Sequence, residues 1–210
     1  GWVEHNPNEI WNTTKKVLLD VIKKSNKLKG KILTIGITNQ RETTILWNKK
    51  TGKPVYNAIV WQDRRTAEFC KKLKTNKKEK FINKKTGLLI DPYFSATKIK
   101  WILDNVLAAK RLARNSNLLF GTVDTFLLWK LTKGKTHATD ATNACRTMLF
   151  NISTNKWDKD ILKIFDIPKN ILPDVKDSSD DFGVTEKSIT KKAYPINGVV
   201  GDQQAATIGQ

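Results

Sequence analysis

The chain has 210 residues, of which 39% are hydrophobic, and 38 Lys and Arg residues against 20 Asp and Glu residues give it a formal charge of +18. This length allows one large domain or two small ones, and seven Trp and eight Phe residues argue against a disordered chain. No apolar run approaches the roughly 20 residues that span a membrane, and the N-terminus lacks a signal-peptide pattern. Cys70 and Cys145 are too few for a disulfide framework or a zinc site, so we expect a cytoplasmic protein with free thiols.

The excess of lysine raises nucleic acid as a possible partner. The lysines, however, are scattered in pairs over predicted helix exteriors and turns, with no long basic block and no aromatic RNA-binding strand. We therefore expect solvated basic faces and no nucleic-acid partner, and a basic nucleic-acid-binding module remains the least favoured alternative. Such a surface would also attract anionic phosphate substrates.

The first elements predicted along the chain are a helix and a strand. Residues 6–9, Asn-Pro-Asn-Glu, have the pattern of a helix start, and apolar residues recur at helical spacing from Ile10 to Ile22. After a break at Gly30, the apolar run at 31–38 predicts a buried strand. A helix followed by a strand is typical of α/β architecture.

A hairpin and a group of helices are predicted next. Strands are expected at 43–47 and 56–61, joined by a turn at 48–54. The middle of the chain then favours helices, which resemble an insertion into the α/β unit, at 64–74, 76–85, 95–106, 107–115 and 122–132.

The last third of the chain is predicted to return to the α/β pattern. A helix is expected at 157–165, and the polar stretch 173–192 indicates a surface loop with short strands. A strand at 196–201 then precedes a helix that begins with Asp202.

Arg41 and Glu42 follow the predicted strand 31–38 directly, at the carboxyl edge of a sheet where α/β proteins bind small ligands. A guanidinium that donates and a carboxylate that accepts can together hold the hydroxyl groups of a small polyol. The alternative is a surface ion pair. Neighbours on an extended strand point to opposite faces, so we expect each of the two to need a different partner.

Asp202 is the strongest candidate for a catalytic group. It lies between a strand end and a helix start, beside Gly201, which allows another backbone segment or a ligand to approach closely. A carboxylate there could orient a substrate hydroxyl and accept its proton during attack on phosphorus. The alternative is a helix N-cap, a position that Asp fills often, and both interpretations can hold together.

Two aromatic residues complete the candidate site. Trp61 could pack its ring on the C–H surface of a polyol, although a core position is the commoner use of Trp. Tyr93 follows the rigid turn Asp91-Pro92, which could aim its phenol at a ligand or close a loop over the core. His5 and His137 have no partners at metal-ligand spacing, and the sequence has no Gly-rich phosphate loop of the common types.

Taken together, these motifs closely resemble the glycerol kinases of the FGGY family of carbohydrate kinases. The segment from Tyr93-Phe94-Ser95 through Thr97-Lys98 to Asp104-Asn105 is similar to a signature of the wider family. The other matching blocks, in order along nearly the whole chain, are 36–44, 57–66, 87–95, 121–125 and 201–206.

The resemblance implies a fold, a reaction and a set of roles. The fold would be an actin-like ATPase (ribonuclease H-like) α/β domain with a helical insertion. The reaction would transfer phosphate from ATP, with Mg²⁺, to glycerol, in a protein that forms homo-oligomers. By motif, Arg41, Glu42, Tyr93 and Asp202 would hold the hydroxyls with help from Gln203, Asp202 would be the base, and Trp61 would be the apolar wall. The alternative is a kinase of the same family acting on another polyol or sugar.

Departures from the family pattern lead to further expectations. The chain has no initiator Met and no Asp-Gly-Thr-Thr type phosphate loop, so we expect residues 1–210 to be most of an N-terminal substrate-binding domain, incomplete at its N-terminus. A nucleotide-binding domain would follow, and the isolated chain would be inactive. The segment 183–195 lacks the Gly-rich, Arg-bearing loop by which some relatives bind a sugar bisphosphate, so such regulation is not expected.

Overall fold

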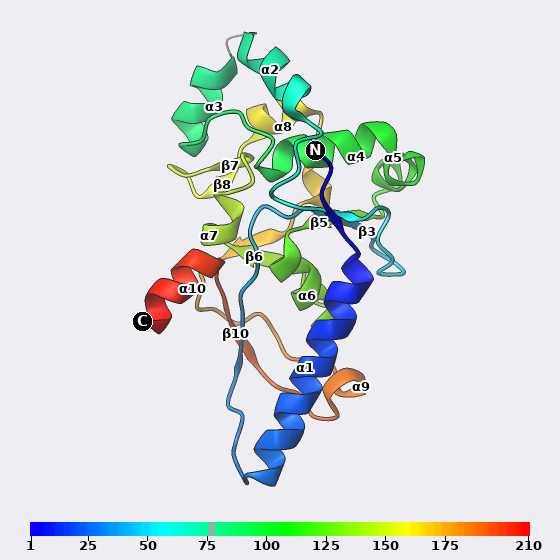
Figure 1. Ribbon diagram of the computed structural model, residues 1–210, viewed down its shortest axis with the longest axis vertical. Helices are drawn as coiled ribbons and strands as arrows, with labels where there is room; N and C mark the ends of the chain where they lie inside the picture. The colour runs from blue at the N-terminus through cyan, green and yellow to red at the C-terminus, as the bar shows by residue number, and fades with distance from the viewer. Residues whose placement is uncertain (76–77) are drawn as a thin grey trace.

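The long helix α1 (Pro7–Lys27) runs down one side of the molecule in the computed structural model, which describes residues 1–75 and 78–210 (Figure 1). The Asn6 side chain caps it by accepting a hydrogen bond from the Asn8 amide at 2.9 Å, and Pro7 occupies the first turn. The predicted helix start is therefore confirmed. Trp11 and Leu18 of α1 pack on an apolar cluster that includes Leu128 and Leu131.

The strand β2 (Ile35–Ile37) lies parallel to β10 (Ile196–Val199), so their carboxyl ends lie at the same edge. This pairing brings the segment after β2 beside the start of the helix α10 (Asp202–Gly209). The strand predicted at 31–38 is shorter than expected. Its partner strand is preceded by Pro195, which has no N–H to donate to residues before Ile35.

The predicted hairpin at 43–61 is present, but its strands pair mainly elsewhere. Thr44 and Ile59 exchange backbone hydrogen bonds at 2.9 and 3.0 Å across it. However, β3 (Ile45–Asn48) forms its antiparallel ladder with β5 (Leu118–Gly121), and β4 (Ala58–Ile59) pairs with β1 (Glu4–His5). Neither β1 nor β5 was predicted.

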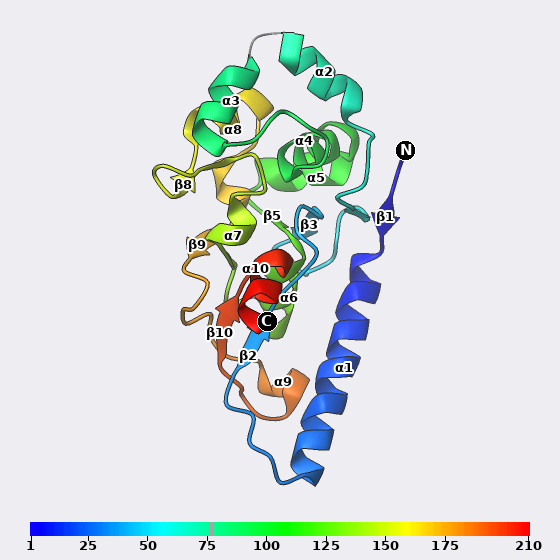
Figure 2. The same ribbon diagram turned by 60° about the vertical axis from the view of Figure 1, so that its left-hand side comes forward.

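A group of helices forms one end of the molecule, as Figures 1 and 2 show. The predicted helices in this region are confirmed within a few residues, except that residues 76 and 77 of the helix expected at 76–85 lie outside the described residues. A large apolar cluster, including Ile99, Ile102 and Phe165, fills this end. Its helices are α2 (Ala67–Thr75), α3 (Lys78–Thr86), α4 (Ser95–Asn105), α5 (Leu107–Arg114) and α8 (Lys159–Phe165).

Short elements connect this end to the rest of the chain. The helix expected at 157–165 begins later, because Asp158 caps α8 and Trp157 belongs to a strand. The stretch 173–192 contains a short strand, as expected, and also a helix that was not predicted. The remaining elements are α6 (Val123–Leu131), β6 (Ala138–Asp140), α7 (Ala141–Ala144), β7 (Phe150–Asn151), β8 (Lys156–Trp157), η1 (Lys169–Ile171), β9 (Asp174–Lys176) and α9 (Lys187–Thr190).

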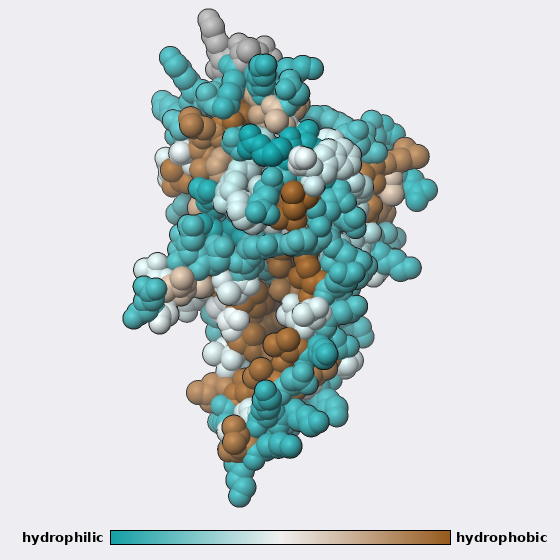
Figure 3. Space-filling view, viewed as in Figure 1, coloured by the Kyte–Doolittle hydropathy of each residue, from teal (hydrophilic) through white to brown (hydrophobic). Residues whose placement is uncertain are grey.

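An apolar strip crosses the surface between α1 and the β2–β10 pair (Figure 3). Val17 and Val21 of α1 and Leu33, just before β2, are exposed large apolar residues in this part of the chain. Among the described residues, β2 forms a ladder only with β10, which leaves its other edge unpaired. None of the described helices is long and apolar enough to cross a membrane.

Candidate functional site

Arg41 lies at the carboxyl end of β2 and binds the first residues of α10. Its Nε donates to Asp202 Oδ1 at 3.1 Å, its Nη2 to Gln203 Oε1 at 2.7 Å and its Nη1 to Gln204 Oε1 at 3.2 Å. A side chain on Gly201 would place its Cβ 2.5 Å from Arg41 Cδ, so glycine is required there. The sequence predicted that a backbone segment or a ligand approaches Gly201, and the group found there is the side chain of Arg41.

Asp202 is the first residue of α10, not its N-cap, which is Gly201. The carboxylate oxygen Oδ1 accepts from the Gln203 amide at 2.9 Å as well as from Arg41. The Asp202 side chain is 48% exposed, so Oδ2 remains open to a ligand.

Glu42 sits in a turn and its carboxylate is almost fully buried. Its φ is +62°, in the left-handed region that non-glycine residues rarely adopt. Oε1 accepts a hydrogen bond from Arg146 Nε at 2.7 Å. Burial raises the pKa of Glu42 above its ordinary value, while Arg146, Arg41 and Lys98 oppose that shift. The expected extended backbone at Arg41 and Glu42 was wrong, but the expectation of separate partners is confirmed.

Tyr93 lies beside the Arg146 guanidinium, and Trp61 packs on Tyr93. The Tyr93 amide donates to Asp91 Oδ1 at 2.9 Å, which fixes the predicted turn before it. The two rings meet edge to face with their centroids 5.6 Å apart, and Arg146 Cζ lies 5.6 Å from the Tyr93 ring centroid. Trp61 remains partly exposed, so it is not a core tryptophan.

All the predicted site residues therefore fall into two adjoining groups. Arg41 contacts Asp202 and Gln203, while Glu42 connects through Arg146 to Tyr93 and from there to Trp61. The peptide bond between Arg41 and Glu42 joins the groups. Together the two groups present a carboxylate open to solvent, several N–H and C=O groups and a partly exposed aromatic surface. Such a combination suits a small molecule bearing hydroxyl groups.

The sequence reasoning missed Arg146, which is 104 residues from Glu42 along the chain. Its position after α7 has no signal in periodicity. One general signal was available: a buried carboxylate needs a cation or several donors, so an acidic residue next to a core strand implies such a partner.

Two buried carboxylates hold the loops that carry this site. Asp124 accepts from Asn39 Nδ2 at 2.8 Å, from Thr139 Oγ1 at 2.7 Å and from Thr122, and burial raises its pKa. Asp140 caps α7 and accepts from the Thr142 hydroxyl at 2.6 Å. That same hydroxyl oxygen accepts from the Gly201 amide at 2.8 Å, which ties the start of α10 to α7.

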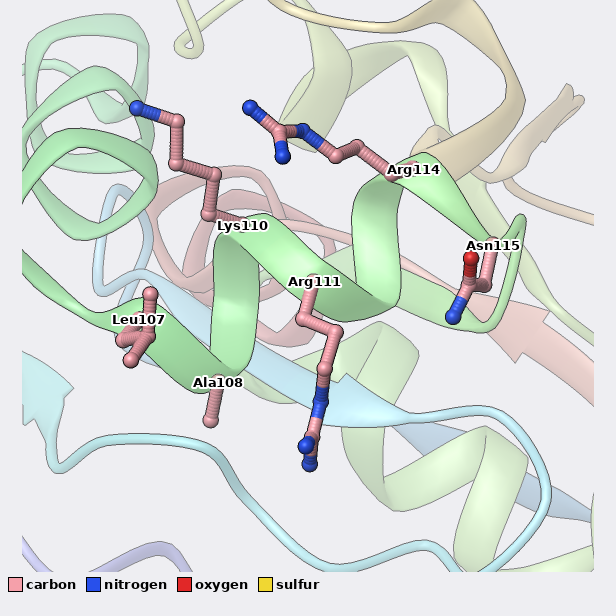
Figure 4. A pocket seen from close by; sticks show the side chains of 6 residues that line it. All are labelled: Leu107, Ala108, Lys110, Arg111, Arg114 and Asn115. Carbon is pink, nitrogen blue, oxygen red and sulfur yellow. The ribbon is translucent and has the colours of Figure 1, made fainter.

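The depression in Figure 4 lies elsewhere, on α5, and does not have the character of a reaction site. Its volume is about 700 Å³, and its lining contains no carboxylate. Figure 4 shows Lys110 and Arg114 pointing to one side and Arg111 to the other, so the cations do not converge.

Histidine, cysteine and acidic side chains are the usual metal ligands of proteins. No group of three or more such residues is placed to hold a metal ion in the described part of the chain. His137 contacts the Phe120 carbonyl oxygen at 2.8 Å and packs on Trp47, in the core.

A family model described as the FGGY family of carbohydrate kinases, N-terminal domain, matches residues 1–209. The chain belongs to this family. Its mixed α/β fold is the actin-like ATPase fold of FGGY N-terminal domains. Solved structures of low identity support the fold alone. One is a gluconate kinase from Lactobacillus acidophilus, with TM-score 0.85 and 23% identity over 99% of this chain and 41% of that chain.

Closer similarity exists to proteins named glycerol kinase. Those of Rhizobium meliloti and Petrotoga mobilis are each 57% identical over 210 residues, which is 100% of this chain and 42% of each relative. A crystal structure of Plasmodium falciparum glycerol kinase with ADP matches with TM-score 0.94 and 41% identity, covering 99% of this chain and 42% of that one. The FGGY chain thus spans less than half the length of these relatives.

Proposed function

We propose that this FGGY chain holds glycerol in an ATP-dependent glycerol kinase, which converts glycerol and ATP into sn-glycerol 3-phosphate and ADP. The observation that carries the proposal is the grouping of Arg41, Glu42, Tyr93, Asp202 and Gln203 beside Trp61. The 57% identity to glycerol kinases supports glycerol as the substrate.

In this proposal, each polar group has a role that its geometry allows. Arg41 and Gln203 can donate to glycerol oxygens, and Glu42 can accept from a hydroxyl, as can the phenol oxygen of Tyr93. Asp202 orients the attacking hydroxyl through its open carboxylate oxygen and takes the proton late, because phosphoryl transfer has a loose transition state. Trp61 packs against the carbon chain of glycerol and limits the access of water.

The nucleotide and its Mg²⁺ are proposed to be held by groups outside these 210 residues. The sequence has no common Gly-rich phosphate loop, and the described residues have no metal-ligand cluster. The 210 residues would then be most of a substrate-binding domain that does not transfer phosphate alone. A cytoplasmic location and a homo-oligomeric state are parts of the same proposal; light scattering of the whole protein tests the latter.

The test is a substrate panel with the whole protein that contains this chain. ATP-dependent phosphorylation would be measured with glycerol, dihydroxyacetone, erythritol and xylulose. We expect the highest kcat/KM with glycerol. A preference for any other compound would replace the proposal with a kinase for another polyol or sugar.

The role of Asp202 has its own test. We expect Asp202→Asn to reduce kcat by about 10²–10⁴-fold or more, because general-base groups contribute that much, while glycerol binding stays largely intact. Glycerol binding would be measured by calorimetry. The control is Asp20→Asn, which changes an exposed carboxylate on α1. Unchanged turnover in Asp202→Asn would refute the base assignment.

A further inference from the structure

Lys98 of α4 is completely buried, with 0% of its surface exposed, yet its ammonium contacts no carboxylate in the described structure. Instead, Nζ donates to two backbone carbonyl oxygens, that of Tyr93 at 2.5 Å and that of Glu42 at 3.2 Å. Lysine is almost never fully buried without a charged partner. An apolar side chain would fill the same space at a lower desolvation cost, so packing alone does not explain this lysine.

Burial lowers the pKa of Lys98 to about 7, although the charges of Glu42, Asp63 and Asp91 act in the opposite direction. Arg65 adds to the lowering. The Lys98 amine has at least two N–H groups whether it is protonated or neutral. It can therefore donate to both carbonyl oxygens at any pH near neutrality. The function inferred for Lys98 is thus donation of hydrogen bonds, not proton transfer.

The backbone carbonyl oxygen of Glu42 accepts several hydrogen bonds from side chains. Besides Lys98, it accepts from Ser95 Oγ at 3.3 Å and from Thr44 Oγ1 at 3.2 Å. The same residue has the left-handed φ of +62°, a conformation that is unfavourable for a residue with a side chain. Donors on this carbonyl hold the unfavourable turn in place, and the turn directs the Glu42 carboxylate toward Arg146.

We propose that Lys98 is a positioning residue that sets the spacing between Glu42 and Tyr93, two walls of the candidate glycerol site. This inference rests on the proposed function. One ammonium bonded to both backbones fixes the carboxylate of Glu42 relative to the phenol of Tyr93, although Lys98 itself does not reach the substrate. A displacement of about 1 Å in such groups is enough to cost on the order of 100-fold in activity.

The test compares Lys98→Met with Lys100→Met in the whole protein. The first variant keeps the length of the side chain and removes its donors, and the second removes a lysine of the same helix that forms an ion pair with Asp104. For Lys98→Met we expect the KM for glycerol to rise by about 10- to 100-fold and the KM for ATP to stay within about twofold. Lys100→Met should match the wild type in both constants.

A purely structural role predicts a different result, namely a lower melting temperature with unchanged KM for glycerol in the folded fraction. That result would overturn the inference. If Lys98→Met does not fold, Lys98→Leu, which also removes the donors, decides by the same two KM values. A wild type that does not phosphorylate glycerol would overturn the proposed function and this inference together, whereas an active wild type with an unaffected variant overturns only the inference.

Discussion

Glu42 combines a buried carboxylate with a left-handed backbone, and both features oppose folding. Because burial raises its pKa, the folded state keeps a proton on Glu42 at pH values where the unfolded chain, near the ordinary 4.5, has lost it. The stability linked to this proton is present below pH 4.5 and is lost as the pH rises through the pKa of the folded state. At neutral pH, therefore, the carboxylate is held at a net cost.

A neutral replacement of Glu42 should separate stability from binding. We expect Glu42→Gln to melt at a temperature equal to or above that of the wild type at about pH 8, with the difference shrinking toward about pH 4 as Glu42 itself becomes protonated. Affinity for glycerol should fall by about tenfold or more, because a charge-assisted hydrogen bond is lost.

Calorimetric melting across pH and glycerol titration measure these two effects. The control is Glu68→Gln, an exposed position on α2. A Glu42→Gln protein that is less stable at about pH 8 than at about pH 4, relative to the wild type, would contradict the expected sign of this pH dependence.

Individual site residues were predictable from sequence where charge follows a strand or precedes a helix. Arg41, Glu42 and Asp202 stand at such junctions, and the parallel β2–β10 pair explains why they converge. Arg146 and Lys98 were not predictable as partners of Glu42, because their contacts with it span 104 and 56 residues of sequence. Only the tertiary fold brings these residues together.

At the scale of elements, Arg65 is one of the groups that attach the strand β1 to the molecule. The Arg65 side chain is 1% exposed and binds Asp63 through two nitrogens, at 2.9 and 2.8 Å, and Glu4 of β1 at 2.7 Å. Its guanidinium also stacks 4.0 Å from the Trp2 ring centroid. A two-residue strand has no ladder long enough to hold itself, so these contacts determine its position.

Removing this guanidinium should therefore destabilise the fold. We expect Arg65→Met to lose about 3–5 kcal/mol of unfolding free energy, because Asp63 is left buried without its cation. The neighbouring variant Arg64→Met removes a surface ion pair with Asp91 and should cost less than about 1 kcal/mol. Urea unfolding of both variants measures the two losses of unfolding free energy. Equal losses would mean that the Arg65 contacts stabilise the fold no more than an ordinary surface ion pair does.

Element prediction succeeded where periodicity was long and failed where it was short. Helices such as α1 and α4 have several turns of pattern, and both were predicted. The strands β1, β7 and β8 have two residues each, which is too short for any alternation. The strand β5 was missed because its apolar run lies between predicted helices and could not be distinguished from them.

At the scale of the whole molecule, the sequence correctly indicated an α/β unit with a group of helices added at one end. Figure 2 shows this group above the region where β2, β10 and α10 meet. The site lies on the α/β side of that junction, but Tyr93 comes from the segment that leads into α4 of the helical group. The insertion therefore contributes to the candidate site as well as to the core.

The apolar strip and the formal charge of +18 have opposite effects on contacts between copies of the chain. Charge repulsion acts over about 10 Å at 0.1 M salt and only about 3 Å at 1 M, whereas apolar contact does not weaken with salt. We expect the chain, produced as these 210 residues, to elute as a monomer at low salt and to associate as salt is added.

Size-exclusion chromatography over a salt series measures this behaviour. Val17→Lys with Val21→Lys removes two exposed apolar side chains from α1 and should keep the chain monomeric throughout, and association unchanged in that variant would place the contact elsewhere. For most basic proteins, added salt is the usual remedy against aggregation during purification. For this chain we expect the opposite because of the apolar strip, and a buffer of low salt concentration should keep the preparation monodisperse.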